Sequence, residues 1–271
     1  MNEFSLPAYD REAEPEKAEK GYCWQTAIGL QAVDGLEPSA YLRETAYRHI
    51  EGEIDFAEAQ ALLDSYYRES AAHTEGSRTE EADKVSARIA QILSEKAFTL
   101  SSGEYIGIHA RLFRGIYPFA GKIRDYNISK NEWVLGGKSV LYGNAFELRA
   151  ALDYDLNEEK QFSYRGLSRE ETIRHLARFI SRLWQIHPFG EGNTRTTAVF
   201  FIQYLRYLGF NATNDSFAEN AWYFRNALVR ANYNDLQAGI YETTEYLELF
   251  LRNLLLSEKN ELNSRELYVG S

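Results

Sequence analysis

The chain has 271 residues, 44% hydrophobic and 26% charged, which is the composition of a soluble globular protein long enough to bury a full core. Its net charge of −10 argues against unselective binding to nucleic acid or anionic lipid, and its only cysteine, Cys23, excludes an intrachain disulfide and a thiolate metal cluster. Because the start of the chain lacks a signal-peptide pattern and no run of about eighteen apolar residues exists, we expect a cytoplasmic protein.

Helical periodicity dominates the first part of the chain. Residues 1–38 are an acidic lead-in without a clear pattern. Two helical pieces are predicted over residues 39–69, and Gly52 can end the first of them. The polar residues 71–83 indicate a linker or exposed turn, and a helix is predicted over residues 84–97.

From Thr99 the chain becomes richer in apolar and aromatic residues, and we expect the main domain there. A helix is predicted over residues 102–113, and an irregular segment over 117–127. Two β-prone runs at 133–142 surround Gly136-Gly137, which favours a tight hairpin. Further helices are predicted over residues 144–153, 169–186, 194–208, 219–232 and 243–256. The fold class is therefore mostly α with one small hairpin.

The chemistry of the chain is concentrated in the loop between two of these helices, His187-Pro-Phe-Gly-Glu-Gly-Asn-Thr-Arg195. Asn193 or Thr194 is suited to cap the second helix, whose first amides lack partners within the helix and favour an anion such as phosphate. Gly192 lets the backbone come close to that ligand, and Arg195 adds a planar cation for its oxygens.

Two further residues of this loop supply reactive groups. Glu191 offers a carboxylate that can hold Mg²⁺ against phosphates, and His187 can take a proton from an attacking hydroxyl. Base, metal ligand, anion hole and cation together favour phosphoryl or nucleotidyl transfer. The alternative is an ordinary capped turn between two helices with a core histidine.

This loop resembles the signature H-x-F-x-[D/E]-G-N-x-R of Fic-domain proteins. Residues 120–124, Ala-Gly-Lys-Ile-Arg, resemble the A-G-x-x-R element of the same family, and Ala231-Asn232 resembles its later A-N element. The resemblance covers residues 99–256 and implies a mainly helical domain with a β-hairpin flap. It also implies an enzyme, a protein adenylyltransferase that moves AMP from Mg-ATP to a Ser, Thr or Tyr hydroxyl of a target protein.

The resemblance assigns roles position by position. His187 is then the catalytic base, Phe189 anchors the loop, and Glu191 holds Mg²⁺. Asn232 falls near the adenine. The nucleotide's phosphates would be bound by Gly190, Glu191, Gly192, Asn193, Thr194 and Arg195. The flap residues Leu135, Gly136, Gly137, Lys138 and Ser139 would hold the target segment by strand addition.

The chain departs from the family motif at two positions. Thr194 replaces a glycine, and Ala198 replaces the last arginine, which grips the γ-phosphate in the family. The phosphorylating branch of the family, which resembles Doc, also lacks that arginine. Phosphorylation and non-catalytic nucleotide binding therefore stay open beside AMP transfer.

A second resemblance lies over residues 39–70, which are similar to the antitoxin-type helix pair that inhibits many Fic domains. Glu51 stands at the position of the inhibitory glutamate, while Tyr47 replaces the expected Ser or Thr. We expect weak self-inhibition, and the alternative is an exposed acid at a helix end. The sequence thus suggests an amino-terminal helical region (1–98), a Fic-like domain (99–256) and a tail (257–271). We expect nucleotide and an unidentified target protein as partners, neither nucleic acid nor membrane, and leave homo-oligomer formation open.

Overall fold

A computed structural model describes residues 15–70, 78–212 and 216–270. The described residues divide into two compact units: an amino-terminal unit that ends at Ala97 and also takes residues 216–221, and a second unit made of residues 98–212 and 222–270. Helices dominate both units, and the described residues hold no β-strand beyond one isolated bridge between Asp235 and Ile240. The mostly α prediction is confirmed. No helix in these ranges is both long and apolar enough to span a membrane.

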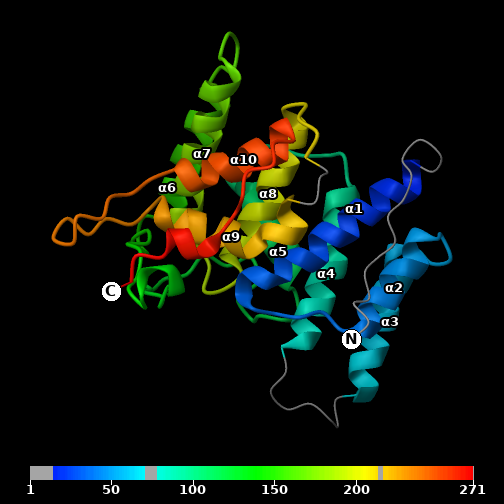
Figure 1. The fold of residues 1–271 in the computed structure, drawn as a ribbon. Coiled ribbons are helices and arrows are strands. Elements are labelled where there is room, and N and C mark those ends of the chain that lie inside the picture. The colour runs from blue at the N-terminus through cyan, green and yellow to red at the C-terminus, as the bar shows by residue number, and fades with distance from the viewer. Residues whose placement is uncertain (1–14, 71–77, 213–215, 271) are drawn as a thin grey trace. The chain divides into compact units, whose positions relative to one another are not determined.

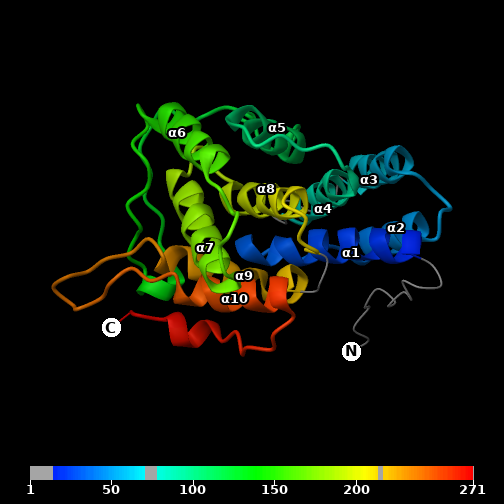
Figure 2. The same ribbon diagram turned by 90° about the horizontal axis from the view of Figure 1, so that it is seen from above.

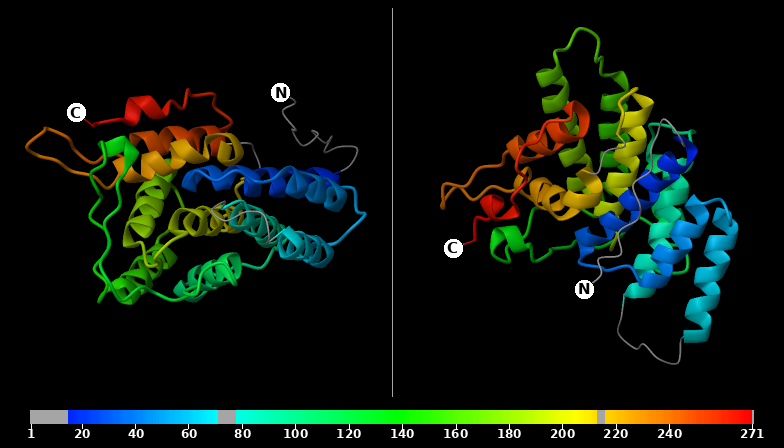
Figure 3. Two further views of the ribbon diagram at one scale, coloured as in Figure 1. Left: turned by 90° about the horizontal axis from the view of Figure 1, so that it is seen from below. Right: turned by 45° about the vertical axis from the view of Figure 1, so that its right-hand side comes forward.

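The amino-terminal unit is a set of helices packed around α1. It contains α1 (Pro15–Gly29), the 3-10 helix η1 (Leu30–Asp34), α2 (Ala40–Ile50), α3 (Phe56–Ser70) and α4 (Thr79–Ser94). Helix α1 packs along α4, and α2 lies beside α3 (Figure 3). Ser39 caps α2 by accepting a hydrogen bond from the Leu42 amide at 3.0 Å. The two predicted helices over residues 39–69 are confirmed.

The prediction of an unpatterned lead-in over residues 1–38 is wrong for the described part, because α1 and η1 occupy residues 15–34. The buried side chains of α1 include Ala18, Cys23, Trp24 and Ala27, and they do not repeat as one clean stripe. Trp24 donates its indole N–H to His49 Nδ1 at 3.1 Å. The helix is therefore stabilised by packing against neighbours distant in sequence, a signal that local periodicity does not carry.

Helix α4 begins at Thr79, earlier than the predicted Lys84. Residues 71–77 of the predicted linker lie outside the described residues. The remainder of that segment is helical. Glu80 and Glu81 pair with residues one helical turn away, whereas Asp83 bonds to residues distant in sequence. Asp83 is fully buried and accepts hydrogen bonds from Tyr67 Oη at 2.6 Å and from the Ser39 amide at 2.8 Å. A polar sequence here marks buried hydrogen bonds and not an exposed turn.

The second unit is built around α8 (Asn193–Tyr207), whose residues are almost all buried from Asn193 to Leu205. Helix α8 lies between α5 (Ser102–Phe113) and α7 (Arg169–Ile186), as Figures 1 and 2 show. Around them pack α6 (Leu148–Gln161), the later part of α9 (Ser216–Arg230) and α10 (Glu245–Leu256). Helix α7 starts at a capping box between Ser168 and Glu171. Helices α5 and α7 have the predicted bounds.

The helix predicted in the region of α6 was placed too early in the chain. The prediction gave residues 144–153, whereas α6 runs over residues 148–161. Asn144 instead accepts a hydrogen bond from the Phe146 amide at 3.1 Å through its side chain, an Asx turn that precedes the helix. Leu152 and Leu156 are buried against the neighbouring helices and extend α6 beyond the predicted end.

The predicted β-hairpin over residues 133–142 is wrong as a pair of strands. Residues 133–135 form the short 3-10 helix η2, and residues 132–138, here called the flap turn, close on themselves. The Glu132 amide donates to the Lys138 carbonyl at 3.0 Å, and the Gly137 amide donates to the Glu132 carbonyl at 3.0 Å. Gly136 and Gly137 do take the predicted positive φ angles, 62° and 87°.

The carboxyl-terminal segment explains why the flap turn is not a hairpin. The Val269 amide donates to the Val134 carbonyl at 2.8 Å, and Leu267, in η3 (Ser264–Leu267), is fully buried. The same segment runs beside α10, where Tyr246 donates its hydroxyl to the Glu266 carbonyl at 3.2 Å (Figure 2). Val134 thus finds its backbone partner in the tail and not in a second flap strand.

Candidate active site

His187 ends helix α7 in the left-handed conformation, with φ 49°, and its side chain is buried. Its Nδ1 lies 3.2 Å from the Trp184 carbonyl oxygen. Because a carbonyl can only accept, Nδ1 carries the proton and Nε2 keeps a lone pair. Burial, followed by the charge of Lys130, lowers the pKa of His187 well below its ordinary value. The imidazole is therefore a neutral base at neutral pH.

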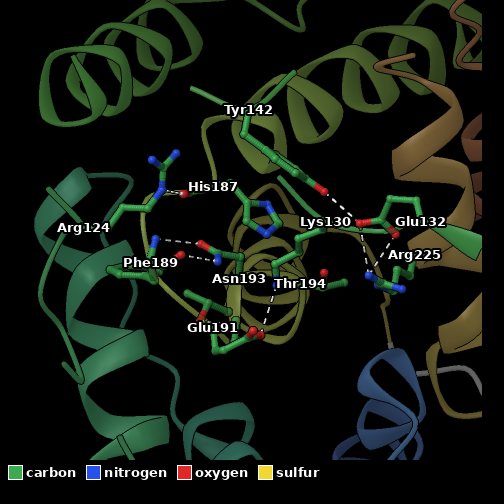
Figure 4. Close-up of polar contacts among 12 residues, drawn as sticks. Arg124, Lys130, Glu132, Tyr142, His187, Phe189, Glu191, Asn193, Thr194 and Arg225 are labelled. Carbon is green, nitrogen blue, oxygen red and sulfur yellow. Dashed lines mark hydrogen bonds and ion pairs between the residues drawn. The ribbon is translucent and has the colours of Figure 1, made fainter. Parts of the chain in front are cut away.

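Arg124 bonds to the backbone at His187 (Figure 4), at the next residue, Pro188, and at Gly143. Its Nε donates to the His187 carbonyl at 2.9 Å, and one terminal nitrogen donates to the Gly143 carbonyl at 2.6 Å. Its own amide donates to the Pro188 carbonyl at 2.9 Å. The sequence analysis gave Arg124 no role, although its place in the A-G-x-x-R element was the available signal. The guanidinium fixes where α7 ends and the loop begins.

Phe189 and Asn193 hold the loop in shape. The Phe189 ring is fully buried and stacks on the His109 imidazole, with ring centroids 3.7 Å apart. The Asn193 side chain accepts from the Phe189 amide at 3.0 Å and donates to the Phe189 carbonyl at 2.8 Å (Figure 4). The predicted anchoring place of Phe189 in the core is what the structure shows. The carboxamide of the Asn193 side chain therefore bridges the loop by bonding to the Phe189 backbone.

His109 ties the loop to the A-G-x-x-R element from behind. Its Nδ1 accepts from the Gly121 amide at 2.8 Å, so its Nε2 donates to the Glu191 carbonyl at 3.0 Å. Burial lowers the pKa of His109 to about 4, which keeps this tautomer neutral. His109 lies in the helix predicted over residues 102–113, and the structure gives it a positioning place directly under the loop.

The loop glycines permit close approach of neighbouring groups. Gly192 has φ 77°, and a Cβ there would lie 2.3 Å from the Phe113 ring. A Cβ at Gly190 would lie 2.7 Å from the Tyr126 hydroxyl. Gly192 is therefore restricted to glycine by space and by backbone conformation, whereas a Cβ at Gly190 would require the exposed Tyr126 side chain to shift.

The start of α8 follows directly after Gly192. By helix geometry its first amides have no acceptor within the helix, and the helix dipole places partial positive charge there. Thr194 accepts the Trp184 indole N–H through Oγ1 at 3.0 Å, and Arg195 is fully buried with its guanidinium 4.8 Å over the Phe113 ring. Ala198, one turn later, is also buried. The start of α8 therefore lies beside His187 in a geometry that suits an anion.

Glu191 is the exposed acid of the loop. Its carboxylate pairs with Lys130 Nζ at 3.0 Å, and its side chain is 49% exposed. The described residues contain no cluster of three or more metal-ligating side chains. A magnesium ion at this place would have the Glu191 carboxylate as its one protein ligand. Its remaining ligands would come from the phosphates of a nucleotide and from water.

This geometry agrees with the comparison to known families. The Fic/DOC family model matches residues 99–205, which contain α5, α7, the loop and most of α8. Residues 99–205 are a Fic/DOC family domain. We call residues 187–195 the Fic loop.

Curated relatives carry the same kind of name at modest identity. A probable protein adenylyltransferase of Sinorhizobium fredii is 27% identical over 51% of this chain and 68% of its own length. A protein adenylyltransferase of Bartonella schoenbuchensis is 31% identical over 38% of this chain and 20% of its own. A probable protein adenylyltransferase of Salmonella typhimurium is 25% identical over 42% of this chain, and the alignment spans 54% of that protein.

Asn232 lies in the second unit, just after the end of α9, and makes none of the contacts described for the Fic loop. Its amide nitrogen donates to the Ser181 carbonyl at 3.0 Å and to the Leu228 carbonyl at 2.9 Å. It lines a cavity of about 600 Å³ that α7 borders with the arginines Arg174, Arg178 and Arg182. A role of Asn232 beside adenine stays a prediction.

Four of the predicted flap residues, Leu135 to Lys138, lie in the flap turn, and Ser139 follows it directly. Leu135 is buried, whereas Gly136 and Gly137 are exposed. Lys138 pairs with Asp235 at 2.8 Å, and Ser139 accepts from the Lys130 amide at 3.0 Å.

The predicted inhibitory residue, Glu51, belongs to the other unit. It caps the end of α2, and its carboxylate pairs with Lys17 Nζ at 2.8 Å.

Proposed function

We propose that the Fic domain transfers AMP from Mg-ATP to a Ser, Thr or Tyr hydroxyl of a target protein. The observation that supports this best is the placement of His187, whose Nδ1 is tied to the Trp184 carbonyl while Nε2 is left as a base beside the start of α8. The names of the relatives, all protein adenylyltransferases, support the same reaction.

The chain's own residues can carry each step. The target hydroxyl gives its proton to His187 Nε2 while its oxygen attacks the α-phosphorus. The bond from that phosphorus to the oxygen of the β-phosphate breaks, and pyrophosphate leaves. Charge that develops on the α-phosphate faces the first amides of α8, held by the Asn193–Phe189 contacts.

Glu191 is the residue that would hold magnesium. When bound, the ion neutralises phosphate charge and orients the leaving group. Glu191 pairs with Lys130 Nζ at 3.0 Å, so this carboxylate already faces a cation. Glu191→Ala should therefore weaken magnesium-dependent nucleotide binding more than nucleotide binding in a chelator.

Ala198 favours one alternative reaction. A methyl group stands where an arginine would contact the γ-phosphate, so the triphosphate can be held with a different phosphate facing His187. Attack at the γ-phosphorus would transfer phosphate and release ADP. The same loop serves both reactions, and the identity of the released product distinguishes them.

The test uses ATP labelled at either the α- or the γ-phosphate, incubated with the full chain and a cell lysate. Label on protein from the α position supports AMP transfer, and label from the γ position supports phosphorylation. Label from neither, with nucleotide still bound in calorimetry, leaves a non-catalytic nucleotide-binding protein. His187→Ala should abolish labelling, while His175→Gln, a change in another histidine of α7, should retain it.

Two finer parts of the proposal concern regulation and docking. The exposed side of the flap turn, around Gly136 and Gly137, would hold an extended target segment by main-chain hydrogen bonds. Glu51 would weakly inhibit nucleotide binding, and Glu51→Gly should then bind ATP more tightly in calorimetry. Unchanged binding would remove the inhibition. The cytoplasmic location remains a prediction from the sequence.

A further inference from the structure

The His187 ring packs against two aromatic side chains that also contact each other. Trp184 meets it edge-on at 5.1 Å between ring centroids, and Tyr142 packs against it at 4.2 Å. Trp184 belongs to the same helix as His187, whereas Tyr142 comes from the segment after the flap turn (Figure 4). Tyr142 is therefore an aromatic ring from a separate segment of the chain that packs against the imidazole.

Tyr142 is itself tied down at its hydroxyl. The hydroxyl donates to Glu132 Oε1 at 2.8 Å. Burial, with the nearby Glu132 charge, raises the pKa of Tyr142 above its ordinary value, so the phenol remains a neutral donor. A ring fixed at both its face and its tip has little freedom to move away from His187.

Glu132 is a fully buried carboxylate with two partners. Besides the Tyr142 hydroxyl it pairs with an Arg225 terminal nitrogen at 2.9 Å from its Oε2. A buried carboxylate is strongly unfavourable unless it is paired and hydrogen-bonded, so this contact set constrains all three side chains together. Arg225 comes from α9, and the cluster therefore joins α9 to the flap turn.

The backbone of the same residue closes the flap turn. The Glu132 amide bonds to the Lys138 carbonyl, and its carbonyl accepts from the Leu135 and Gly137 amides. One residue thus shapes the flap turn through its backbone and holds the His187 neighbour through its side chain. Movement of the flap turn would be passed to Tyr142 through a single residue.

We propose that Glu132, Tyr142 and Arg225 form a positioning cluster that orients the His187 imidazole and couples it to the flap turn. This rests on the proposed function, in which His187 is the base. The cluster does not touch the reacting atoms. It acts by keeping Nε2 directed at the hydroxyl that a docked target presents.

The first test is Tyr142→Phe, which keeps the ring and removes only the hydroxyl. We expect kcat to fall about tenfold, the effect that loss of one buried hydrogen bond supports, while the Kd for ATP changes less than about twofold. Tyr154→Phe, an exposed tyrosine of α6, is the matched control and should leave both values unchanged. Equal losses in kcat and ATP affinity would overturn the proposal.

A second variant separates the two contacts of Glu132. Glu132→Gln retains an acceptor for Tyr142 and loses the charge that pairs with Arg225. If both contacts serve one cluster, the kcat of the double variant with Tyr142→Phe should be close to that of the worse single variant, because residues acting as a unit are not additive. Multiplied losses would show that the two side chains act independently and would contradict the cluster.

A measurement without turnover keeps this inference distinct from the proposed function. In long-range ¹H–¹⁵N spectra, with His187→Ala used to assign the signals, wild-type His187 should show one neutral tautomer protonated at Nδ1. Tyr142→Phe should show a mixture of both tautomers. An unchanged spectrum overturns the positioning role, whereas wild-type protein that shows this tautomer but transfers no AMP overturns the proposed function alone.

Discussion

The Fic loop and the flap turn differ in how far along the chain the partners of their hydrogen bonds and ion pairs lie. In the Fic loop the Asn193 side chain bonds to the Phe189 backbone four residues earlier, and both lie within the signature itself. In the flap turn, Val134 pairs with Val269 and Glu132 with Arg225, more than ninety residues away. The Fic loop therefore combines an internal side-chain contact with support from Arg124 and His109, whereas the flap turn combines its internal backbone bonds with contacts to α9 and the tail.

That difference explains why one region was predictable and the other was not. The two segments each carry two closely spaced glycines, and Gly136, Gly137 and Gly192 take positive φ angles. In the Fic loop those signals occur between two long amphipathic helices that fix both ends. The flap turn has no such flanks, so a bond to the tail replaced the expected strand pairing. Local signals decide a structure only where their surroundings are rigid.

Replacing one glycine in each region by alanine tests this contrast, and we expect it to give the largest change in the free energy of unfolding. Gly192→Ala places a Cβ against the buried Phe113 ring at positive φ and should reduce the free energy of unfolding by about 3–5 kcal/mol. Gly137→Ala, also at positive φ but in open space, should cost about 1 kcal/mol. Urea unfolding of both variants measures the difference, and equal losses would contradict the contrast.

Arg124 tests how far the Fic loop depends on one residue outside its signature. Arg124→Met leaves the His187 and Gly143 carbonyls without their charged donor and should cost about 2–3 kcal/mol in the free energy of unfolding. Transfer activity should fall as well, because the end of α7 is no longer fixed. Arg149→Met, at an exposed arginine paired within α6, is the control. If the two variants lose the same free energy of unfolding, the Arg124 hydrogen bonds do not hold the loop.

His109 adds a pH dependence to the same region. Its pKa of about 4, below the ordinary 6.5, means that the unfolded chain takes up a proton first as pH falls. His109 should therefore lower the free energy of unfolding by about 1.4 kcal/mol per pH unit between pH 6.5 and about 4.

His109→Leu removes this titration together with two hydrogen bonds. The variant should be about 2 kcal/mol less stable than wild type at pH 8. Because wild type loses about 1.4 kcal/mol per pH unit below pH 6.5, the difference should vanish at about pH 5 and reverse towards pH 4. Denaturant unfolding at several pH values follows the gap, and a gap independent of pH would show that His109 is not buried as a neutral base.

The smallest effect is expected on the outside of the flap turn. Lys138→Met breaks an exposed ion pair with Asp235, and such pairs contribute little to stability. The thermal midpoint should stay within experimental error, while KM for a protein target changes if the flap turn docks it. A clear loss of stability would mean that the flap turn is held by its surface charges and not by Glu132 and Val134.

Sequence periodicity was reliable where a helix has one buried face. Helix α7 has the predicted bounds because its capping box and apolar stripe agree, and α5 does so for a similar reason. Helix α1 was missed because its buried residues follow the packing of its neighbours. The supporting residues Lys130, Glu132 and Tyr142 were given no role, since no local pattern links them to His187. Arg124 was given none either, although it lies in the A-G-x-x-R element.

The sequence by itself determined the mostly helical fold, the helix–loop–helix around His187 and the family of residues 99–205, because each depends on residues close together in the chain. Only the tertiary structure decided the tautomer of His187, the Arg124 clamp and the conformation of the flap turn. Each of these depends on hydrogen bonds or ion pairs between distant segments, and a buried polar group takes whichever partner the fold brings to it.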